Sequence, residues 1–219
     1  MGSAQAPTAA EIIAGVRYQL RDANQKQYDD AELLAFLNDW NAEVYKSLVY
    51  DQSELIRTGS GTITTVAGTE TYSLSAVAIA MGDFWAPHRV WIAGYEPLDK
   101  GDEDDRYAYE QTSGTFTRGQ PESFYLTAGS MGFVPVPDAI YTVRVKYYPE
   151  FAPIASTAGT MPYRNLFNQQ IAYGAQLTAK ARQMQNAAIE TSMMQLHSDI
   201  AHKIVSLRTK GSYQFTVEV

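Results

Sequence analysis

The sequence predicts an α+β fold: a helical bundle, formed by helices from the N- and C-terminal regions, with an inserted antiparallel β-sheet or sandwich. Apolar residues recur every three or four positions in the first 50 residues and again after residue 162, as in amphipathic helices. The middle of the chain is rich in Thr, Val, Gly and Tyr with alternating polarity, which is typical of strands. We therefore expect an N-terminal helical hairpin (1–57), a β-rich domain (58–150), C-terminal helices (151–210) and a strand-like tail (211–219).

The N-terminal region predicts two helices joined by a short loop. Thr8 and Glu11 have the spacing of a capping box, which marks the start of the first helix. Asp29 or Asp30 is the expected N-cap of the second helix. Apolar residues follow with helical spacing at Ile12, Ile13, Val16 and Leu20, and then at Leu33, Leu37, Trp40, Val44 and Leu48.

The middle region predicts six strands, at residues 62–66, 71–74, 89–92, 123–126, 131–134 and 141–147. The last of these alternates most clearly. Its odd-numbered residues are apolar or aromatic, while Thr142, Arg144 and Lys146 occupy the even positions. One face of this strand is therefore expected to be buried and the other to face water.

The region after the β-rich domain predicts a helix that begins at Pro162 and continues to about Arg208. A phase slip in the apolar pattern predicts a turn or kink near Gln185 and Asn186. Apolar residues in the first half are spread around more than one face, which indicates a helix contacted on several sides. Three aromatic residues here are candidates for an interface with another protein: Tyr163, Phe167 and Tyr173.

The last residues of the sequence have a strand pattern, in which the odd positions are Tyr213, Phe215, Val217 and Val219. Burying these four side chains would contribute about 6–12 kcal/mol in total. Ordering seven backbone residues costs about 7–14 kcal/mol, so the two contributions nearly cancel. The tail is therefore expected either to add a strand to a sheet edge of a partner or to complete a sheet of its own chain.

The composition excludes several classes of protein. The chain has 219 residues, of which 45% are hydrophobic and 19% charged, as expected of a globular protein. It contains no cysteine, which excludes disulfides, thiol nucleophiles and thiolate zinc sites. No basic, apolar leader or 18-residue apolar segment is present, so we expect a soluble chain that is not exported by that route and has no membrane partner. The net charge of -7 disfavours a sequence-reading nucleic-acid binder.

No motif predicts a catalytic residue, a metal ligand or a cofactor. His197 and His202 are five positions apart on the last predicted helix, so they do not share a face. No G-x-S-x-G elbow accompanies His88, and no glycine run has the spacing of a phosphate-binding loop. The acidic run Asp102–Asp105 lacks the calcium-binding spacing of an EF-hand, so we expect a solvated loop, with cation binding left open.

Most aromatic residues occupy positions that a core would also fill. Tyr107, Tyr109 and Phe116 lie instead in a long polar stretch, so they are candidates for exposed contact residues. The aromatic content also leaves open a glycan-binding or other β-rich binding module as an alternative function.

The order of several motifs resembles the head-to-tail adaptor (connector) proteins of tailed bacteriophages. The N-terminal region offers Leu20-Arg21-Asp22, the aromatic Tyr28 before acids, Leu33-Leu34-x-x-Leu37-Asn38 and then Glu43. The middle region adds Pro121-Glu122-Ser123-Phe124-Tyr125, Phe133-Val134-Pro135-Val136-Pro137-Asp138 and Val143-Arg144-Val145-Lys146-Tyr147-Tyr148, followed by Met161-Pro162-Tyr163. The similarity extends over nearly the whole chain.

The resemblance implies a structural virion protein without catalysis or cofactor. It implies a ring, usually of twelve copies, that docks beneath the portal at the capsid vertex, surrounds a channel for the genomic DNA and receives downstream tail or nozzle proteins. The expected location is the neck of the virion, after assembly in the host cytoplasm. In this setting the strand at Tyr213, Phe215, Val217 and Val219 is a candidate for docking on the portal or on an adjacent subunit. The candidates for a subunit or tail interface are Tyr107, Tyr109, Phe116, Tyr163, Phe167 and Tyr173. The alternative function is then that of a glycan-binding or other tail-associated β-rich binding module.

Overall fold

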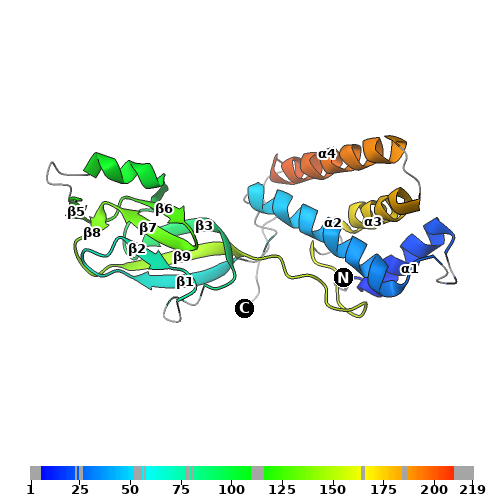
Figure 1. Cartoon of the computed structure of the whole chain (residues 1–219), viewed down its shortest axis with the longest axis horizontal. Helices are drawn as coiled ribbons and strands as arrows, with labels where there is room; N and C mark the ends of the chain where they lie inside the picture. Colours follow the sequence, from blue (N-terminus) through cyan, green and yellow to red (C-terminus); the bar gives the residue numbers. More distant parts are fainter. Residues whose placement is uncertain are drawn as a thin grey trace. The chain divides into compact units, whose positions relative to one another are not determined.

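The computed structural model describes residues 6–22, 24, 27–51, 56, 58–76, 79, 81–109, 116–163, 166–183 and 187–209. The protein has the predicted α+β fold (Figure 1). The chain divides into two compact units, which we call the helical unit (Met1–Ile56 and Phe151–Val219) and the sheet unit (Arg57–Glu150).

The first helix of the helical unit, α1 (Ala9–Leu20), begins with the predicted capping box. The backbone N–H of Glu11 donates to Thr8 Oγ1 (3.3 Å), and the backbone N–H of Thr8 donates to Glu11 Oε2 (2.8 Å). These bonds satisfy two backbone donors that a helix N-terminus leaves without an intrahelical partner. The helix ends at Leu20 and is followed by the C-cap residue Arg21, whose φ of 58° lies in the left-handed region.

The second helix, α2 (Asp30–Tyr50), is capped by Asp29, which accepts a hydrogen bond from the backbone N–H of Glu32 (2.7 Å). All five apolar positions predicted for its buried face are buried: Leu33, Leu37, Trp40, Val44 and Leu48. Their spacing places them on one stripe, which packs mainly against α3 (Asn168–Gln183).

The C-terminal part of the helical unit contains α3, which ends at Gln183, and α4 (Ala187–Thr209). Gln185 and Asn186, where the sequence predicts a turn or kink, lie outside the described residues. The predicted start at Pro162 is wrong, because α3 begins only at Asn168. Tyr163 has a φ of 66°, a left-handed conformation that a right-handed helix does not accommodate. α3 contacts α1, α2 and α4, which agrees with the expectation of a helix contacted on several sides.

The described residues of the sheet unit form two main sheets and one short parallel pair. The first sheet has the antiparallel order β1–β9–β3, formed by Gly59–Thr64, Thr142–Pro149 and Phe84–Ile92. The second sheet has the order β2–β7–β6–β4, formed by Thr71–Ser73, Ser130–Val134, Ser123–Thr127 and Asp99–Lys100, with β4 parallel to β6. The short pair joins β5 (Arg118–Gly119) to β8 (Val136–Pro137).

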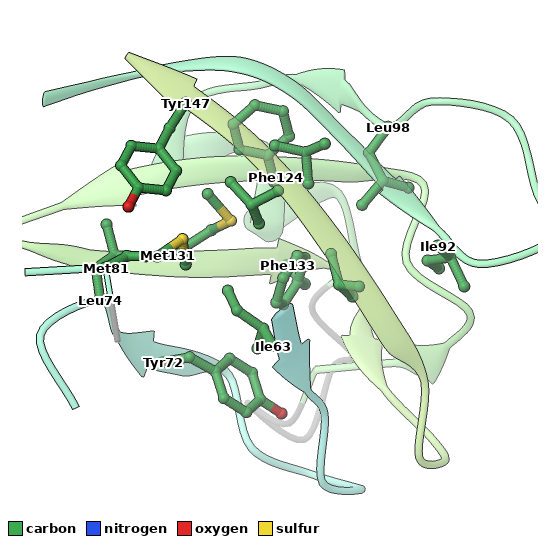
Figure 2. Close-up of a cluster of buried hydrophobic side chains, with 13 residues drawn as sticks. Ile63, Tyr72, Leu74, Met81, Ile92, Leu98, Phe124, Met131, Phe133 and Tyr147 are labelled. Carbon is green, nitrogen blue, oxygen red and sulfur yellow. The ribbon is translucent and has the colours of Figure 1, made fainter. Parts of the chain in front are cut away.

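The two main sheets share one hydrophobic core (Figure 2). Ile63, Val143 and Val145 contribute from the first sheet, and Met131 and Phe133 contribute from the second. As predicted, the alternate residues Arg144 and Lys146 of β9 are exposed. In the register of β1 with β9, Gly59 lies opposite Tyr147, so the two ends of the sheet unit are adjacent within it.

The outer face of the second sheet is covered by a 3₁₀ helix that the sequence pattern did not predict, η1 (Glu103–Tyr109). Phe124 of β6 points into the shared core, so the neighbouring Tyr125 lies on the opposite face. There Tyr125 is buried beneath η1 and lies opposite Gly132 of β7. A Cβ at position 132 would lie 2.1 Å from Cζ of Tyr125, so glycine makes room for the tyrosine ring.

No helix in the described part of the chain is both long and apolar enough to cross a lipid bilayer.

Candidate interaction surfaces

The four candidate docking residues of the tail, Tyr213, Phe215, Val217 and Val219, lie outside the described residues. The other six candidate contact residues are described. They fall into one group on the sheet unit and one group on the helical unit.

On the sheet unit, Arg106, Tyr107 and Phe116 form what we call the η1 aromatic cluster. The ring centroids of Tyr107 and Phe116 are 6.4 Å apart. The guanidinium carbon of Arg106 lies 5.2 Å from the Tyr107 ring centroid and 5.6 Å from that of Phe116. Tyr107 is 53% exposed, so the cluster presents an aromatic surface with a cation bound against its rings.

The η1 aromatic cluster is anchored to the sheet beneath it through Glu70. Arg106 Nη1 and the Tyr125 hydroxyl both donate to Glu70 Oε1, at 2.7 Å and 2.8 Å. Partial burial acts to raise the pKa of the Glu70 carboxyl, but the hydrogen bonds from Arg106 and Tyr125 and the charge of Arg106 outweigh it, so the pKa is lowered. Burial, together with the hydrogen bond to Glu70, raises the pKa of Tyr125 to about 12.

Tyr109 makes a separate contact at the end of η1. Its hydroxyl donates to Glu122 Oε2 at 3.2 Å, and this hydrogen bond raises the pKa of Tyr109. The tyrosine is thus held against the loop that precedes β6, next to the aromatic cluster.

On the helical unit, Tyr163, Phe167 and Tyr173 have three different environments. Tyr163 is half-buried, packs edge-to-face on Phe167 (5.9 Å between centroids), and donates from its hydroxyl to the Asn41 carbonyl at 3.2 Å. Phe167 is fully buried, so it belongs to the core of this unit and not to its surface. Tyr173 is 45% exposed.

Tyr173 lines a groove of about 390 Å³ between α1 and α3. The α1 side is formed by Ile12, Gly15 and Gln19, and the α3 side includes Ala172 and Gln176. Both helices line this groove with a mixture of small or apolar side chains (Ile12, Gly15, Ala172) and polar ones (Glu11, Gln19, Gln176), which makes it the second candidate contact surface. The sequence indicated Tyr173 but not its α1 partners, because helix pairing is not visible in a periodic pattern.

The outer side of the first sheet carries a surface that sequence reasoning missed. Arg89 of β3 lies opposite Lys146 of β9, and Trp91 lies opposite Arg144. Thr62 lies opposite Arg144 on β1, the strand that pairs with the other edge of β9. We call Arg89, Arg144 and Lys146 the basic face. The sequence placed Arg144 and Lys146 on one exposed face, but the addition of Arg89 required knowledge of which strand pairs with β9.

His88 and His197 each pack against an aromatic residue, and His202 is exposed. His88 Nδ1 is 2.9 Å from the Tyr148 hydroxyl, and the His197 ring lies 4.9 Å from that of Trp40. Within the described ranges, no three His, Asp or Glu side chains are grouped so that they could hold a metal ion. Asp102 and Asp105 of the acidic run instead accept hydrogen bonds from nearby backbone N–H groups, at 2.6 Å and 2.7 Å.

Comparison with known proteins identifies one family. A family model described as SU10 adaptor protein matches residues 7–210, which cover nearly all of both units. No curated protein matches the chain.

Proposed function

The chain belongs to the SU10 adaptor protein family and is thus a structural adaptor protein of a bacteriophage; from this premise we propose that it forms a ring beneath the portal. The ring, of twelve copies, links the capsid to downstream tail or nozzle proteins and surrounds the channel through which the genome passes. Its place is the neck of the virion, and it is assembled in the host cytoplasm.

The observation that carries this proposal is the extent of the family match, which includes the helical and the sheet unit together. A closed ring requires two different surfaces on each subunit, because each copy contacts one neighbour with one surface and the other neighbour with another. The η1 aromatic cluster and the α1–α3 groove supply surfaces of suitable composition on separate units.

The aromatic residues of these surfaces are the contact residues in this proposal: Tyr107 and Tyr173 are exposed, and Tyr109 and Phe116 are partly buried. Tyr107 and Phe116, with Tyr109 beside them, form a contact for a neighbouring subunit or tail protein, and Tyr173 forms one on the helical unit. Tyrosine combines a large apolar ring with a polar hydroxyl, which is why it is enriched at protein interfaces. Tyr163 and Phe167 support the helical unit from within.

The C-terminal strand-like segment (211–219) has a different role. Tyr213, Phe215, Val217 and Val219 add a strand to a sheet edge of the portal or of an adjacent subunit. The near balance between burial and ordering favours a tail that gains its order from a partner.

The charge of the chain suits a conduit for DNA. With 24 acidic and 17 basic residues, the protein has few cations to offer to phosphates. A channel wall that does not neutralise phosphates does not retain the DNA, so the genome can slide through it.

The test is to mix the purified protein with its cognate portal and to examine the particles by electron microscopy. We expect twelvefold rings attached to one end of the portal, with density for both units in each subunit. Free protein that remains monomeric agrees with the proposal, since the portal then serves as the template. Portal particles that stay bare at concentrations of adaptor well above those of the portal would contradict it.

A further inference from the structure

The basic face has an unusual charge composition for a protein with a net charge of -7. The strands β1, β9 and β3 contain three Lys and Arg residues and no Asp or Glu. All three cations are exposed on the side of the sheet that faces away from the core. Two of them, Arg144 and Lys146, line an open depression of about 280 Å³ together with Ser60, Thr62 and Trp91.

The arrangement within the basic face is unfavourable in the isolated chain. Arg89 and Lys146 are directly opposite one another in antiparallel strands, and like charges in this position destabilise a sheet. Arg89 also lies over the Trp91 ring, at 5.9 Å from its centroid. Among the ion pairs of the described residues, none involves Arg89, Arg144 or Lys146. An anionic partner from outside the chain would relieve this repulsion.

The sheet unit carries a matching anionic surface in the residues Asp99–Asp105, which we call the acidic segment. It has five acidic residues and one basic residue, and the carboxylates of Asp99 and Asp104 are exposed. Asp102 and Asp105 hold the backbone of the segment in shape through their hydrogen bonds. The segment is thus ordered before any partner arrives.

The two surfaces lie on opposite sides of the sheet unit. The basic face is the outer side of the first sheet, and the acidic segment leads into η1, which covers the outer side of the second sheet. Figure 1 shows η1, the green helix, beyond β6 and β7 on the side away from β1 and β9. The hydrophobic core lies between them, so one chain cannot bring its own two surfaces together.

We propose that the acidic segment of one copy docks on the basic face of the next copy, and that this contact joins neighbouring subunits. The inference rests on the proposed ring and assigns part of its subunit interface. Because the two surfaces differ and lie on opposite sides, the contact is head-to-tail, the type that generates rings. Asp99 and Asp104 contact Arg144 and Lys146, while Thr62 and Trp91 line the depression that receives the segment.

The observations favour a second copy over DNA as the occupant. Three cations on a short sheet offer few phosphate contacts, and the affinity of proteins for duplex DNA grows with the number of such contacts. The complementary acidic surface, by contrast, is present on every copy at the same concentration as the basic face. Charge complementarity across an interface also fixes its register and suppresses wrong contacts.

The first experiment uses the fact that the chain has no cysteine. A variant with both Thr62→Cys and Lys100→Cys keeps all the proposed acid–base contacts and places one thiol on each surface. Rings of this variant on the cognate portal, treated with a short bismaleimide, should give a ladder of crosslinked multimers. Rings of either single-cysteine variant should give only monomers. A monomer band from rings of the double variant would overturn the inference while the proposed function stands.

The second experiment exchanges the charges. We expect the base-reversed variant Arg144→Glu/Lys146→Glu and the acid-reversed variant Asp99→Lys/Asp104→Lys each to need at least tenfold more protein to form rings on the portal. A chain with all four changes should regain ring formation, because each interface then has its charges exchanged. Failure of the four-fold variant to regain rings, or normal assembly of the two reversed variants, would overturn the inference.

Two controls separate binding from folding. Lys146→Glu places a carboxylate opposite Arg89, so the Tm of the free protein should not fall even as assembly weakens. Arg118→Glu makes the equivalent charge change on β5, outside both surfaces, and should assemble normally. If the wild-type protein binds a DNA duplex in fluorescence anisotropy, and base reversal removes this binding without affecting rings, DNA is the occupant and the inference is overturned. Wild-type protein that forms no rings would contradict the proposed function itself.

Discussion

Gly174 of α3 lies directly against the indole ring of Trp40 on α2. A Cβ at position 174 would lie 2.2 Å from Trp40 Cδ2, so only glycine allows the two helices to approach this closely. The indole N–H donates to Thr178 Oγ1, one turn further along α3, at 3.0 Å. The glycine and the threonine together fix the position of the tryptophan ring between the two helices.

Gly174→Ala should therefore destabilise the protein, although alanine is the better helix former by about 1 kcal/mol. The overlap with Trp40 requires a shift of backbone or ring, and we expect a net loss of about 1–3 kcal/mol in the free energy of unfolding, measured by urea denaturation. Gly15→Ala in α1 is the matched control, because nothing lies within 4 Å of its Cβ position. The control should be slightly stabilised. An equal response of the two variants would contradict the close contact.

The buried ion pair of Arg17 and Asp22 should contribute much more to the free energy of unfolding than an exposed ion pair does. Arg17 is 6% exposed and Asp22 4%, and Arg17 also donates to the Tyr28 carbonyl (2.7 Å) and to Asp30 (2.7 Å). Asp22→Asn removes the buried one of the two carboxylates that pair with the guanidinium, so we expect a loss of about 3 kcal/mol in the free energy of unfolding. Glu43→Gln removes the exposed pair with Lys46 and should cost at most about 1 kcal/mol.

The Glu70 site should make stability depend on pH in the acid range. The pKa of Glu70 is lowered in the folded protein, so its stabilising contribution is complete above the ordinary pKa of 4.5 and is lost as the pH falls through the lower folded value. Glu70→Gln should be less stable than the wild type at pH 7. The difference should shrink below pH 4.5, as measured by Tm across a pH series. A difference that is independent of pH would show that the charge of Glu70 does not contribute.

Tyr107 and Phe167 should respond in opposite ways to truncation. Tyr107 is exposed, so Tyr107→Ala should leave the stability of the free protein within about 0.5 kcal/mol and weaken ring formation or tail attachment. Phe167 is fully buried, and Phe167→Ala should cost about 3–5 kcal/mol in the free energy of unfolding. Rings that form normally with Tyr107→Ala would remove this residue from the proposed contacts.

Deletion of the residues after Gly211 tests the role of the tail. If Tyr213, Phe215, Val217 and Val219 dock on the portal, the shortened protein should keep the circular dichroism spectrum and Tm of the full chain but no longer attach to portal particles. A shortened protein that is unfolded would instead favour a tail that completes a sheet of its own chain.

The elements that the sequence predicted well are those whose signal is local. The capping box of Thr8 and Glu11 and the apolar stripe of α2 depend on neighbouring residues, and both are confirmed. The alternation in β9 likewise reports on one strand only, and the structure buries and exposes its side chains as expected.

The features that the sequence did not reveal depend on long-range contacts. Tyr163 adopts a left-handed conformation and its hydroxyl binds the carbonyl of Asn41 on α2, so the helix after Pro162 starts later than its apolar pattern suggests. The sequence pattern did not predict η1, because the helix is anchored by a hydrogen bond from Arg106 to Glu70, which lies 36 residues earlier in the chain. The basic face was incomplete for the same reason, since the pairing of Arg89 with Lys146 is a property of the sheet and not of either strand.

The pairing of Gly59 with Tyr147 has a consequence for how such proteins diversify. Because the sheet unit enters and leaves through two adjacent strands, a single exchange of the DNA that encodes it can substitute another module with similarly spaced ends. The gene segments on either side of the exchanged one encode the helices, and they would remain unchanged. Recombination between related phages can thereby change what one half of the protein recognises while the other half is inherited unaltered.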